Sequence, residues 1–235
     1  RIAKCYWSLQ IYRSKDATYR FIFNSVFATK FYKLLSIQKR DKNMNIKALT
    51  IGLAFASVTT LSMAKPVAYQ IDPTHTATVF SWSHFGFSTP SANFSDIQGT
   101  INVDNAKPAN SSVNVVIPLS SINSNVPALD KEFQKEAWFD ATKYPNITFK
   151  STKVQAVGGN KYKITGDLTV KNVTKSVVLD AVLNKQGVHP MTKAETVGFN
   201  ATTSFDRSAF GIGAYVPNVG DKISVNITTE ASVAK

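Results

Sequence analysis

The chain of 235 residues contains a single cysteine, Cys5, and has none from Lys65 to its last residue. No disulfide can therefore cross-link that larger part of the chain, and zinc or redox sites built from cysteine are excluded there. At this length a hydrophobic core alone is able to hold a domain together.

Histidine is almost as scarce, with only His75, His84 and His189 in the whole chain. A catalytic zinc site usually needs three protein ligands. If His75 and His84 shared one strand, they would lie about 30 Å apart at roughly 3.3 Å per residue. We therefore expect structural or surface histidines, and assign no metal ligand and no cofactor.

Acidic residues are rare only at the front of the chain. Residues 1–64 hold 11 Lys/Arg and 2 Asp/Glu, whereas residues 65–235 hold 16 and 13, so most of the net charge of +12 lies outside the main body. Nucleic-acid binding needs a basic patch on the folded domain itself. We expect no nucleic-acid partner.

Residues 1–43 contain no Gly, Pro or Met, but nine aromatic residues and 10 Lys/Arg, and no clean amphipathic period runs through them. The first methionine is Met44. We interpret residues 1–43 as a prefix translated from upstream sequence or a mis-set start. A basic organellar presequence is the alternative, and its position ahead of a bacterial-type signal argues against it.

Residues 44–64 have the three parts of a secretory signal peptide. Lys47 supplies a positive charge, residues 48–58 are mostly apolar, and Ser62-Met63-Ala64 offers small residues at both specificity positions. We predict cleavage after Ala64 and a periplasmic mature protein. An uncleaved anchor is the alternative, although the apolar run is short for a membrane span.

Residues 65–235 are dominated by alternation of apolar and polar residues, which indicates half-buried β-strands. The same spacing recurs in the segments around residues 113–119, 162–171, 177–183, 197–205 and 223–230. Further strands are expected at Val67–Asp72, Thr76–Phe85, Phe94–Val103 and Asn146–Val157. Gly158-Gly159-Asn160 predicts a hairpin, and Asp104-Asn105, Asn172 and Gly187 predict turns.

One segment departs from this pattern and predicts a short helix over Pro127 to Trp138. Leu129, Phe133 and Ala137 are spaced four residues apart, and Pro127 suits a first helical turn. Residues 65–235 are thus expected to form one all-β domain with one inserted helix. A sandwich and a barrel are both compatible, but about eight long strands joined by short turns favour an antiparallel barrel.

No catalytic motif accompanies the strands. Gly-x-Ser-x-Gly is absent, and Gly211-Ile212-Gly213 lacks the helix and third glycine of a phosphate-binding loop. Aromatic residues on the expected inward faces either fill a core or line a cavity for an elongated apolar ligand. His84 and Arg207 follow two such faces, where a polar group could bind a head group; a salt bridge from Arg207 to Asp206 is the structural alternative. The residues proposed to bind the ligand are Phe80, Trp82, His84, Phe149, Leu168, Phe199, Phe205 and Arg207.

Several segments of the chain resemble the YceI-like family, in matching order and over nearly all of residues 65–235. They are Tyr69-Gln70-Ile71-Asp72-Pro73-Thr74-His75, Phe80-Ser81-Trp82-Ser83-His84, Gly99-Thr100-Ile101, Trp138-Phe139-Asp140-Ala141-Thr142-Lys143-Tyr144-Pro145, Gly166-Asp167-Leu168-Thr169-Val170-Lys171-Asn172-Val173-Thr174-Lys175 and Phe205-Asp206-Arg207-Ser208-Ala209-Phe210-Gly211.

This resemblance implies an extended, lipocalin-like β-barrel that is exported and binds polyisoprenoid or other long-chain lipids without catalysing a reaction. It also implies a homodimer as one oligomeric state, since dimers occur in the family, and it assigns no catalytic residue. Two other functions are compatible with the residues alone. One is an enzyme acting on a lipid or small amphiphile with His84 as acid or base, and the other is an outer-membrane barrel.

Overall fold

The computed structural model describes the backbone of residues 9–13 and 19–23, and residues 65–234 in full. The two short segments, β1 (Leu9–Arg13) and β2 (Tyr19–Phe23), pair as an antiparallel ribbon. The remainder of the predicted prefix 1–43, the predicted signal peptide 44–64 and its cleavage site lie outside the described residues. Among the described residues, no helix is both long and apolar enough to cross a bilayer.

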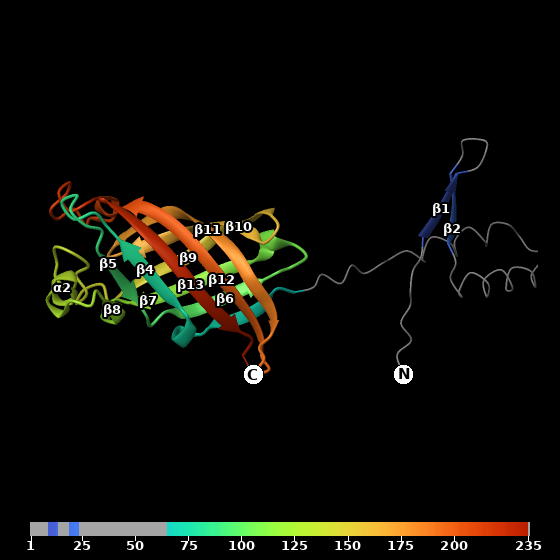
Figure 1. Ribbon diagram of the computed structural model, residues 1–235, viewed down its shortest axis with the longest axis horizontal. Helices are drawn as coiled ribbons and strands as arrows, with labels where there is room; N and C mark the ends of the chain where they lie inside the picture. The colour runs from blue at the N-terminus through green and yellow to red at the C-terminus, as the bar shows by residue number, and fades with distance from the viewer. Residues whose placement is uncertain (1–8, 14–18, 24–64, 235) are drawn as a thin grey trace, which may run out of the picture. The chain divides into compact units, whose positions relative to one another are not determined.

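Residues 65–234 form an all-β domain with one short α-helix, α2 (Pro127–Phe133) (Figure 1). The strands are β3 (Val67–Ile71), β4 (Ala77–Ser81), β5 (Ser91–Phe94), β6 (Gln98–Val103), β7 (Ser112–Pro118), β8 (Ile122–Asn123), β9 (Asn146–Gly158), β10 (Lys161–Val170), β11 (Val173–Val188), β12 (Glu195–Asp206) and β13 (Lys222–Ser232). Four 3-10 turns connect them, η3 (Pro73–His75), η4 (Pro108–Asn110), η5 (Leu119–Ser121) and η6 (Arg207–Phe210).

Eight of these strands close into a barrel, which confirms the barrel rather than the sandwich. Their order is β12-β11-β10-β9-β7-β6-β3-β13, every neighbouring pair is antiparallel, and β12 pairs with β13 to complete the ring. A further set, β4-β5-β8, continues from the other part of β13. β3 pairs with β13 at Ala231 and Ser232, and β4 pairs with residues 224–228, so one long strand supports both in turn.

The expected alternation is seen in the long hairpin of β9 and β10. Ile147 and Phe149 are buried on β9 on either side of Thr148, and a register shift between Ser151 and Lys153 then moves the next buried position to Val154. The predicted turn joins the two strands, with Gly158 and Gly159 at φ +113° and +57°, a region that only glycine enters easily. Gly166 on β10 is needed for another reason, because a Cβ there would lie 2.4 Å from a ring carbon of Phe149.

Three predictions about the strands and turns are wrong. β4 ends at Ser81 rather than Phe85, where the chain leaves the sheet for a loop over residues 82–90. The strand expected at Phe94–Val103 is two strands, β5 and β6, which pair with different partners and are separated by the buried Ile97. Gly187 is not in a turn, since it pairs with Thr196 inside the β11–β12 ladder.

The helix ends at Phe133 rather than at Trp138. After Phe133 the backbone tightens into turns, and the Phe139 amide donates back to the Phe133 carbonyl oxygen at 3.1 Å. The reversal brings the Trp138 and Phe139 rings onto the Phe133 ring, with centroid separations of 5.5 and 6.0 Å. Three aromatic rings therefore pack together at the point where the helix stops.

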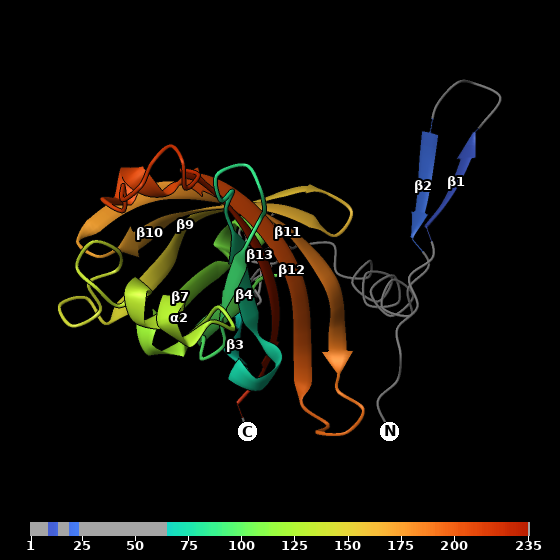
Figure 2. The same cartoon turned by 60° about the vertical axis from the view of Figure 1, so that its left-hand side comes forward.

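The two ends of the barrel differ. At the end called here the open end, α2, the loop 82–90 and the segment 207–221 gather together, as the two views show (Figures 1 and 2). At the opposite, closed end, five buried side chains form a separate cluster: Tyr69, Ile71, Ile101, Val197 and Ala231. Val197 and Ala231 are both 0% exposed, so the interior is filled there.

Candidate binding cavity

The barrel interior between the closed-end cluster and the open end is hollow. The space that the centre of a water molecule can occupy is about 230 Å³, and each strand of the barrel contributes at least one lining residue. The lining is almost wholly aliphatic and aromatic. Its polar members are four threonines and one arginine: Thr76, Thr78, Thr203, Thr229 and Arg207.

Seven of the eight side chains predicted to bind the ligand line this cavity. Alternation on the strands places Phe80, Phe149, Leu168, Phe199 and Phe205 there, and they are joined by Trp82, directly after β4, and Arg207, at the start of η6. The eighth, His84, lies in an adjoining hollow at the open end, which shares Trp82, Phe133 and Trp138 with this cavity. Contact with a ligand stays a prediction for all eight.

The aromatic rings near the open end stack along the wall and do not fill the interior. The Phe80 ring stacks on Phe94 and Trp82, with centroid separations of 5.4 and 5.7 Å and interplanar angles of 24° and 29°. Phe133 then meets Trp82 edge to face at 5.8 Å. These contacts join β4, β5 and the α2 segment into one apolar surface that faces the hollow.

Sequence reasoning missed the part of the lining that α2 supplies. Phe133 lies at the end of α2, with Trp138 and Phe139 in the turns after it, and all three line the cavity although this segment is not β-structure. The helical spacing of Leu129 and Phe133 did indicate a buried face, but periodicity does not say which surface that face covers. The four lining threonines carried no signal, because threonine is common on either face of a strand.

Arg207 lies in the wall, 6% exposed, and is held by backbone carbonyl oxygens. Its Nε donates to Gly220 at 3.0 Å, Nη1 to Ile212 at 2.7 Å, and Nη2 to Ala214 and Val219 at 2.9 and 2.7 Å. Four of the five guanidinium N–H groups are therefore engaged. Burial of the charged group lowers the pKa of Arg207.

Arg207 therefore organises the segment 211–220 at the open end. Its guanidinium also lies over the Trp138 ring at 5.4 Å from the centroid, which ties that segment to the α2 region. The hydrogen bonds go to carbonyl oxygens and not to Asp206, the alternative partner considered from the sequence. Asp221 fixes η6 beside it by accepting from the Ser208 amide and hydroxyl at 2.8 and 2.6 Å, and these bonds lower the pKa of Asp221.

The rim of the open end is apolar and exposed. The Phe85 amide donates to the backbone carbonyl oxygen of Asn218, and the Gly220 amide donates to that of Ser83, each at 2.7 Å. The loop 82–90 and the segment 211–220 are therefore hydrogen-bonded side by side. At this rim Phe85, Tyr215 and Phe87 are 52%, 69% and 92% exposed. Such a rim gives an apolar molecule a continuous surface from the outside to the cavity.

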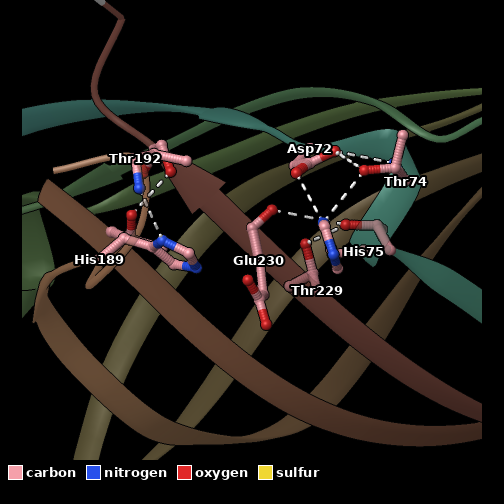
Figure 3. Close-up of polar contacts among 10 residues, drawn as sticks. Asp72, Thr74, His75, His189, Thr192, Thr229 and Glu230 are labelled. Atoms are coloured by element: carbon pink, nitrogen blue, oxygen red, sulfur yellow. Dashed lines mark hydrogen bonds and ion pairs between the residues drawn. The ribbon is translucent and has the colours of Figure 1, made fainter. Parts of the chain in front are cut away.

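The other two histidines lie in surface contacts outside the cavity (Figure 3). His75 Nδ1 lies 2.8 Å from Asp72 Oδ2, and this contact raises the pKa of His75. His189 Nδ1 accepts from the Met191 and Thr192 amides, both at 3.2 Å, and so caps a turn. Within residues 65–234 no three His, Cys, Asp or Glu side chains come together as a metal site would require.

A model of the YceI-like domain matches residues 69–231, which is most of the chain. The chain belongs to the YceI-like family. Two relatives in Pseudomonas putida and Vibrio parahaemolyticus, each called a UPF0312 protein, are 36% and 37% identical to it over 167 and 172 residues. The alignments cover 70% of this chain and 85% and 90% of the relatives.

Three solved structures share the barrel fold. The Campylobacter jejuni YceI protein is 30% identical, with a TM-score of 0.59 over 65% of this chain and 90% of the other. Burkholderia cenocepacia BcnA is 24% identical, with a TM-score of 0.62 over 68% and 99%. A polyisoprenoid binding domain from Saccharophagus degradans is 13% identical, with a TM-score of 0.57 over 72% and 99%, and shows the fold alone.

Proposed function

We propose that this YceI-like protein is an exported, non-catalytic binding protein that holds a polyisoprenoid or other long-chain amphiphilic lipid in the barrel. The observation that carries the proposal is the hollow, nearly all-apolar interior, which opens at an apolar rim. A structural neighbour described as a polyisoprenoid binding domain supports the class of ligand.

The driving force is burial of the lipid chain. Each methylene moved from water into such a cavity contributes about 0.8 kcal/mol. Ten buried methylenes therefore give about 8 kcal/mol before the cost of immobilising the chain, without any polar contact. A lining with almost no polar groups is suited to this kind of recognition, because it selects a ligand by the length and width of its chain and not by specific polar contacts.

The composition of the lining favours binding over catalysis. Its only polar side chains are threonines and Arg207, and most of the N–H groups of Arg207 are engaged. General acid–base catalysis needs a positioned group of suitable pKa next to the substrate. His84 lines the hollow at the open end, and absence of turnover across a pH–rate profile on candidate lipid substrates would count against the enzyme alternative.

The outer wall argues against the alternative of a barrel embedded in a membrane. The outward positions of β9, β10 and β11 carry exposed charged side chains, and Lys163 is paired with Asp180 at 2.7 Å. Across the neighbouring strands, Lys150 lies opposite the exposed Asp167. A lipid-facing wall would place apolar residues at these positions, because charge there is costly.

The proposed function is tested by filling the cavity. Ala201 lines it on β12, and the next residue, Thr202, is exposed. We expect Ala201→Trp to weaken binding of geranylgeraniol and 1-hexadecanol at least tenfold in calorimetric titrations, because the indole occupies the space that the chain needs. Thr202→Trp is the matched control and should leave both affinities unchanged. Equal affinities for the two variants would contradict binding inside the barrel.

Export is part of the proposal and has its own test. The basis is the sequence pattern of residues 44–64. N-terminal sequencing of the protein from a periplasmic fraction should begin at Lys65. A periplasmic chain that begins within residues 1–43 would contradict both the cleavage site and the interpretation of the prefix.

A further inference from the structure

The wall of the barrel has a seam between β11 and β12. β11 pairs with β10 from Val173 onward, but its pairing with β12 begins only at Asp180 opposite Thr202. Beyond Thr202, β12 continues to Asp206 paired only with β13. Within the described domain, residues 173–179 and 203–206 therefore lack the second neighbouring strand that a closed barrel otherwise provides.

The 3-10 turn η6 lies alongside β11 at this seam. At the seam, the ring of Phe205 on β12 contacts the ring of Phe210 in η6 at a centroid separation of 5.3 Å, and Phe210 is buried. Side chains and one short turn thus close this stretch of wall in place of a ladder of backbone hydrogen bonds. Because no strand covers this stretch, a polar side chain that starts on the cavity side of the sheet can extend through the seam to water.

Lys175 occupies such a position. It lies opposite Leu168 in the β10–β11 ladder and alternates with Val173 and Val177. Leu168 and Val177 line the cavity, while the hydroxyl groups of Thr169 and Thr174, hydrogen-bonded at 2.8 Å, mark the outer face. The side chain of Lys175 therefore leaves the backbone on the inner face of the sheet.

Despite this register, Lys175 is exposed. An exposed lysine whose side chain leaves the backbone on the apolar face is expected to extend its charged end to solvent, as lysine does at apolar boundaries. Among the hydrogen bonds and ion pairs of residues 65–234, none involves Lys175, in contrast to Lys163 on the outer face, which is paired with Asp180. Lys175 is thus a cation at the edge of the cavity whose donors face solvent.

We propose that Lys175 binds the oxyanion head group of an acidic lipid, a carboxylate or a phosphate, at the seam while the lipid chain lies in the cavity. This inference rests on the proposed function and adds the class of head group. Arg207 is less suited to the task because its guanidinium is buried and largely engaged with carbonyl oxygens. An ammonium with three rotatable donors accepts either oxyanion.

The test uses three lipids with the same C16 chain: palmitate, hexadecyl phosphate and 1-hexadecanol. At low salt we expect Lys175→Met to weaken binding of the two acidic lipids about 3- to 10-fold, as loss of a partly exposed charge-assisted contact would. Affinity for 1-hexadecanol should not change. Lys175→Arg should keep the affinity for the acidic lipids, and high salt should reduce the difference between wild type and Lys175→Met.

Lys153→Met is the matched control, since Lys153 is an exposed lysine of β9 opposite Thr165 and its removal should leave all three affinities unchanged. A loss confined to the phosphate or to the carboxylate supports the inference and identifies the head group. Unchanged binding of both acidic lipids, or an equal loss for 1-hexadecanol, overturns it. If the wild type binds none of the three, the proposed function itself fails.

Discussion

The closed-end cluster and the cavity are built from the same alternating strands but differ in how they use the space between them. At the closed end, Tyr69 is 1% exposed and packs with Val197 and Ala231, which are both 0% exposed. A few residues further along the same strands, Phe199 and Ile227 line an open cavity. Alternation thus decides which side chains face inward, whereas size and packing direction decide whether the interior is filled.

The physical difference lies in where the large side chains extend. Tyr69 occupies the interior of the closed end, and its hydroxyl accepts from Gln186 Nε2 at 3.0 Å. Smaller side chains pack with it in the same cluster, in which Val197 lies opposite Ala231 and Ala231 lies opposite Ile71. In the hollow part, Phe80 and Phe94 instead stack nearly parallel along the wall. The closed end is therefore expected to supply stability, and the hollow part to supply binding.

The largest effect is expected at the closed end. Tyr69→Ala removes a fully buried aromatic side chain and should lower the free energy of unfolding by about 3–5 kcal/mol. It also leaves the Gln186 amide without its acceptor. Urea denaturation of the ligand-free protein measures this change. Tyr69→Phe keeps the ring and should cost only about 1 kcal/mol, so a loss as large as that of Tyr69→Ala would show that the hydroxyl contact matters more than the packing of the ring.

A somewhat smaller effect is expected at the open end, where polar contacts replace close packing. Arg207→Met keeps an apolar stem but leaves four carbonyl oxygens without their donor. We expect a loss of about 3 kcal/mol in the free energy of unfolding, since each unsatisfied buried group costs about 1–3 kcal/mol and some of the carbonyls will gain water.

Hydrogen exchange separates this structural role from simple loss of packing. In Arg207→Met, the amides of Gly220 and Val219, which are hydrogen-bonded within the open end, should exchange much faster. Amides of the closed end, such as that of Val197, should change only as far as global stability changes. Uniform acceleration of both regions would contradict the assignment of Arg207 to the open end alone.

The fold was largely predictable from sequence because the alternation of apolar and polar residues within a strand indicates which of its faces is buried. Phe149 illustrates this, as it faces inward where the pattern placed it, whereas Val154 is buried only because the β9–β10 register shifts between Ser151 and Lys153. The closure of β12 on β13 was only one of two compatible architectures, because pairing between distant strands leaves no local signal. Five of the seven predicted residues that line the cavity lie on strands and were predictable for the same reason, whereas Trp82 and Arg207 lie directly after the ends of β4 and β12.

The missing parts of the site were those that depend on contacts between distant segments. Trp138 and Phe139 line the cavity because the chain reverses after Phe133, and nothing in the spacing of these residues indicates that reversal. The four carbonyl partners of Arg207 come from a loop without periodicity. Whether the interior is hollow depends on volumes summed over all strands, which no single segment encodes.

A smaller effect on stability is expected at Phe199, where the two regions meet. Phe199 packs against the closed-end cluster on one side and lines the cavity on the other. Phe199→Ala in the ligand-free protein should cost less than about 2 kcal/mol, below the roughly 3–5 kcal/mol of a fully packed ring. It should also weaken binding of 1-hexadecanol, because part of the wall that the chain contacts is gone.

Two measurements on the same variant test this, urea denaturation and calorimetric titration. A cost of about 4 kcal/mol, typical of a packed ring, with unchanged lipid affinity would place Phe199 in the filled region. A severe loss of stability together with a wild-type protein that binds no long-chain lipid would mean that the barrel is a packed core and that the proposed function is wrong.

The smallest effect is expected at the outer corner that joins the two regions, where η3 connects β3 of the closed end to β4 of the hollow part. Asp72 caps this turn by accepting from the Thr74 amide and hydroxyl at 2.9 and 2.6 Å and by contacting His75 at 2.8 Å. The Thr74 hydroxyl and His75 lower the pKa of Asp72 from 3.8 to about 2. Contact with Asp72 raises the pKa of His75 above 6.5.

The two shifts give the corner a definite pH dependence. A lowered carboxyl pKa contributes stability above about pH 3.8 that is lost as the pH falls toward 2. A raised histidine pKa contributes stability below about pH 6.5 that is lost as the pH rises through the folded value. The difference in stability between wild type and Asp72→Ala should therefore be largest near pH 5.5, smaller at pH 8 and smallest at pH 2, as measured by urea denaturation.

A second background isolates the histidine. In His75→Gln, the cost of Asp72→Ala should be the same at pH 5.5 and pH 8, because the group that titrates between these values is gone. Asp96→Ala, which removes an exposed aspartate that accepts from Gln98 at 3.2 Å, is the matched control and should show no maximum near pH 5.5. A cost of Asp72→Ala that stays flat from pH 2 to pH 8 would mean that Asp72 holds the corner as a neutral cap, and that the junction between the filled and hollow regions does not depend on charge.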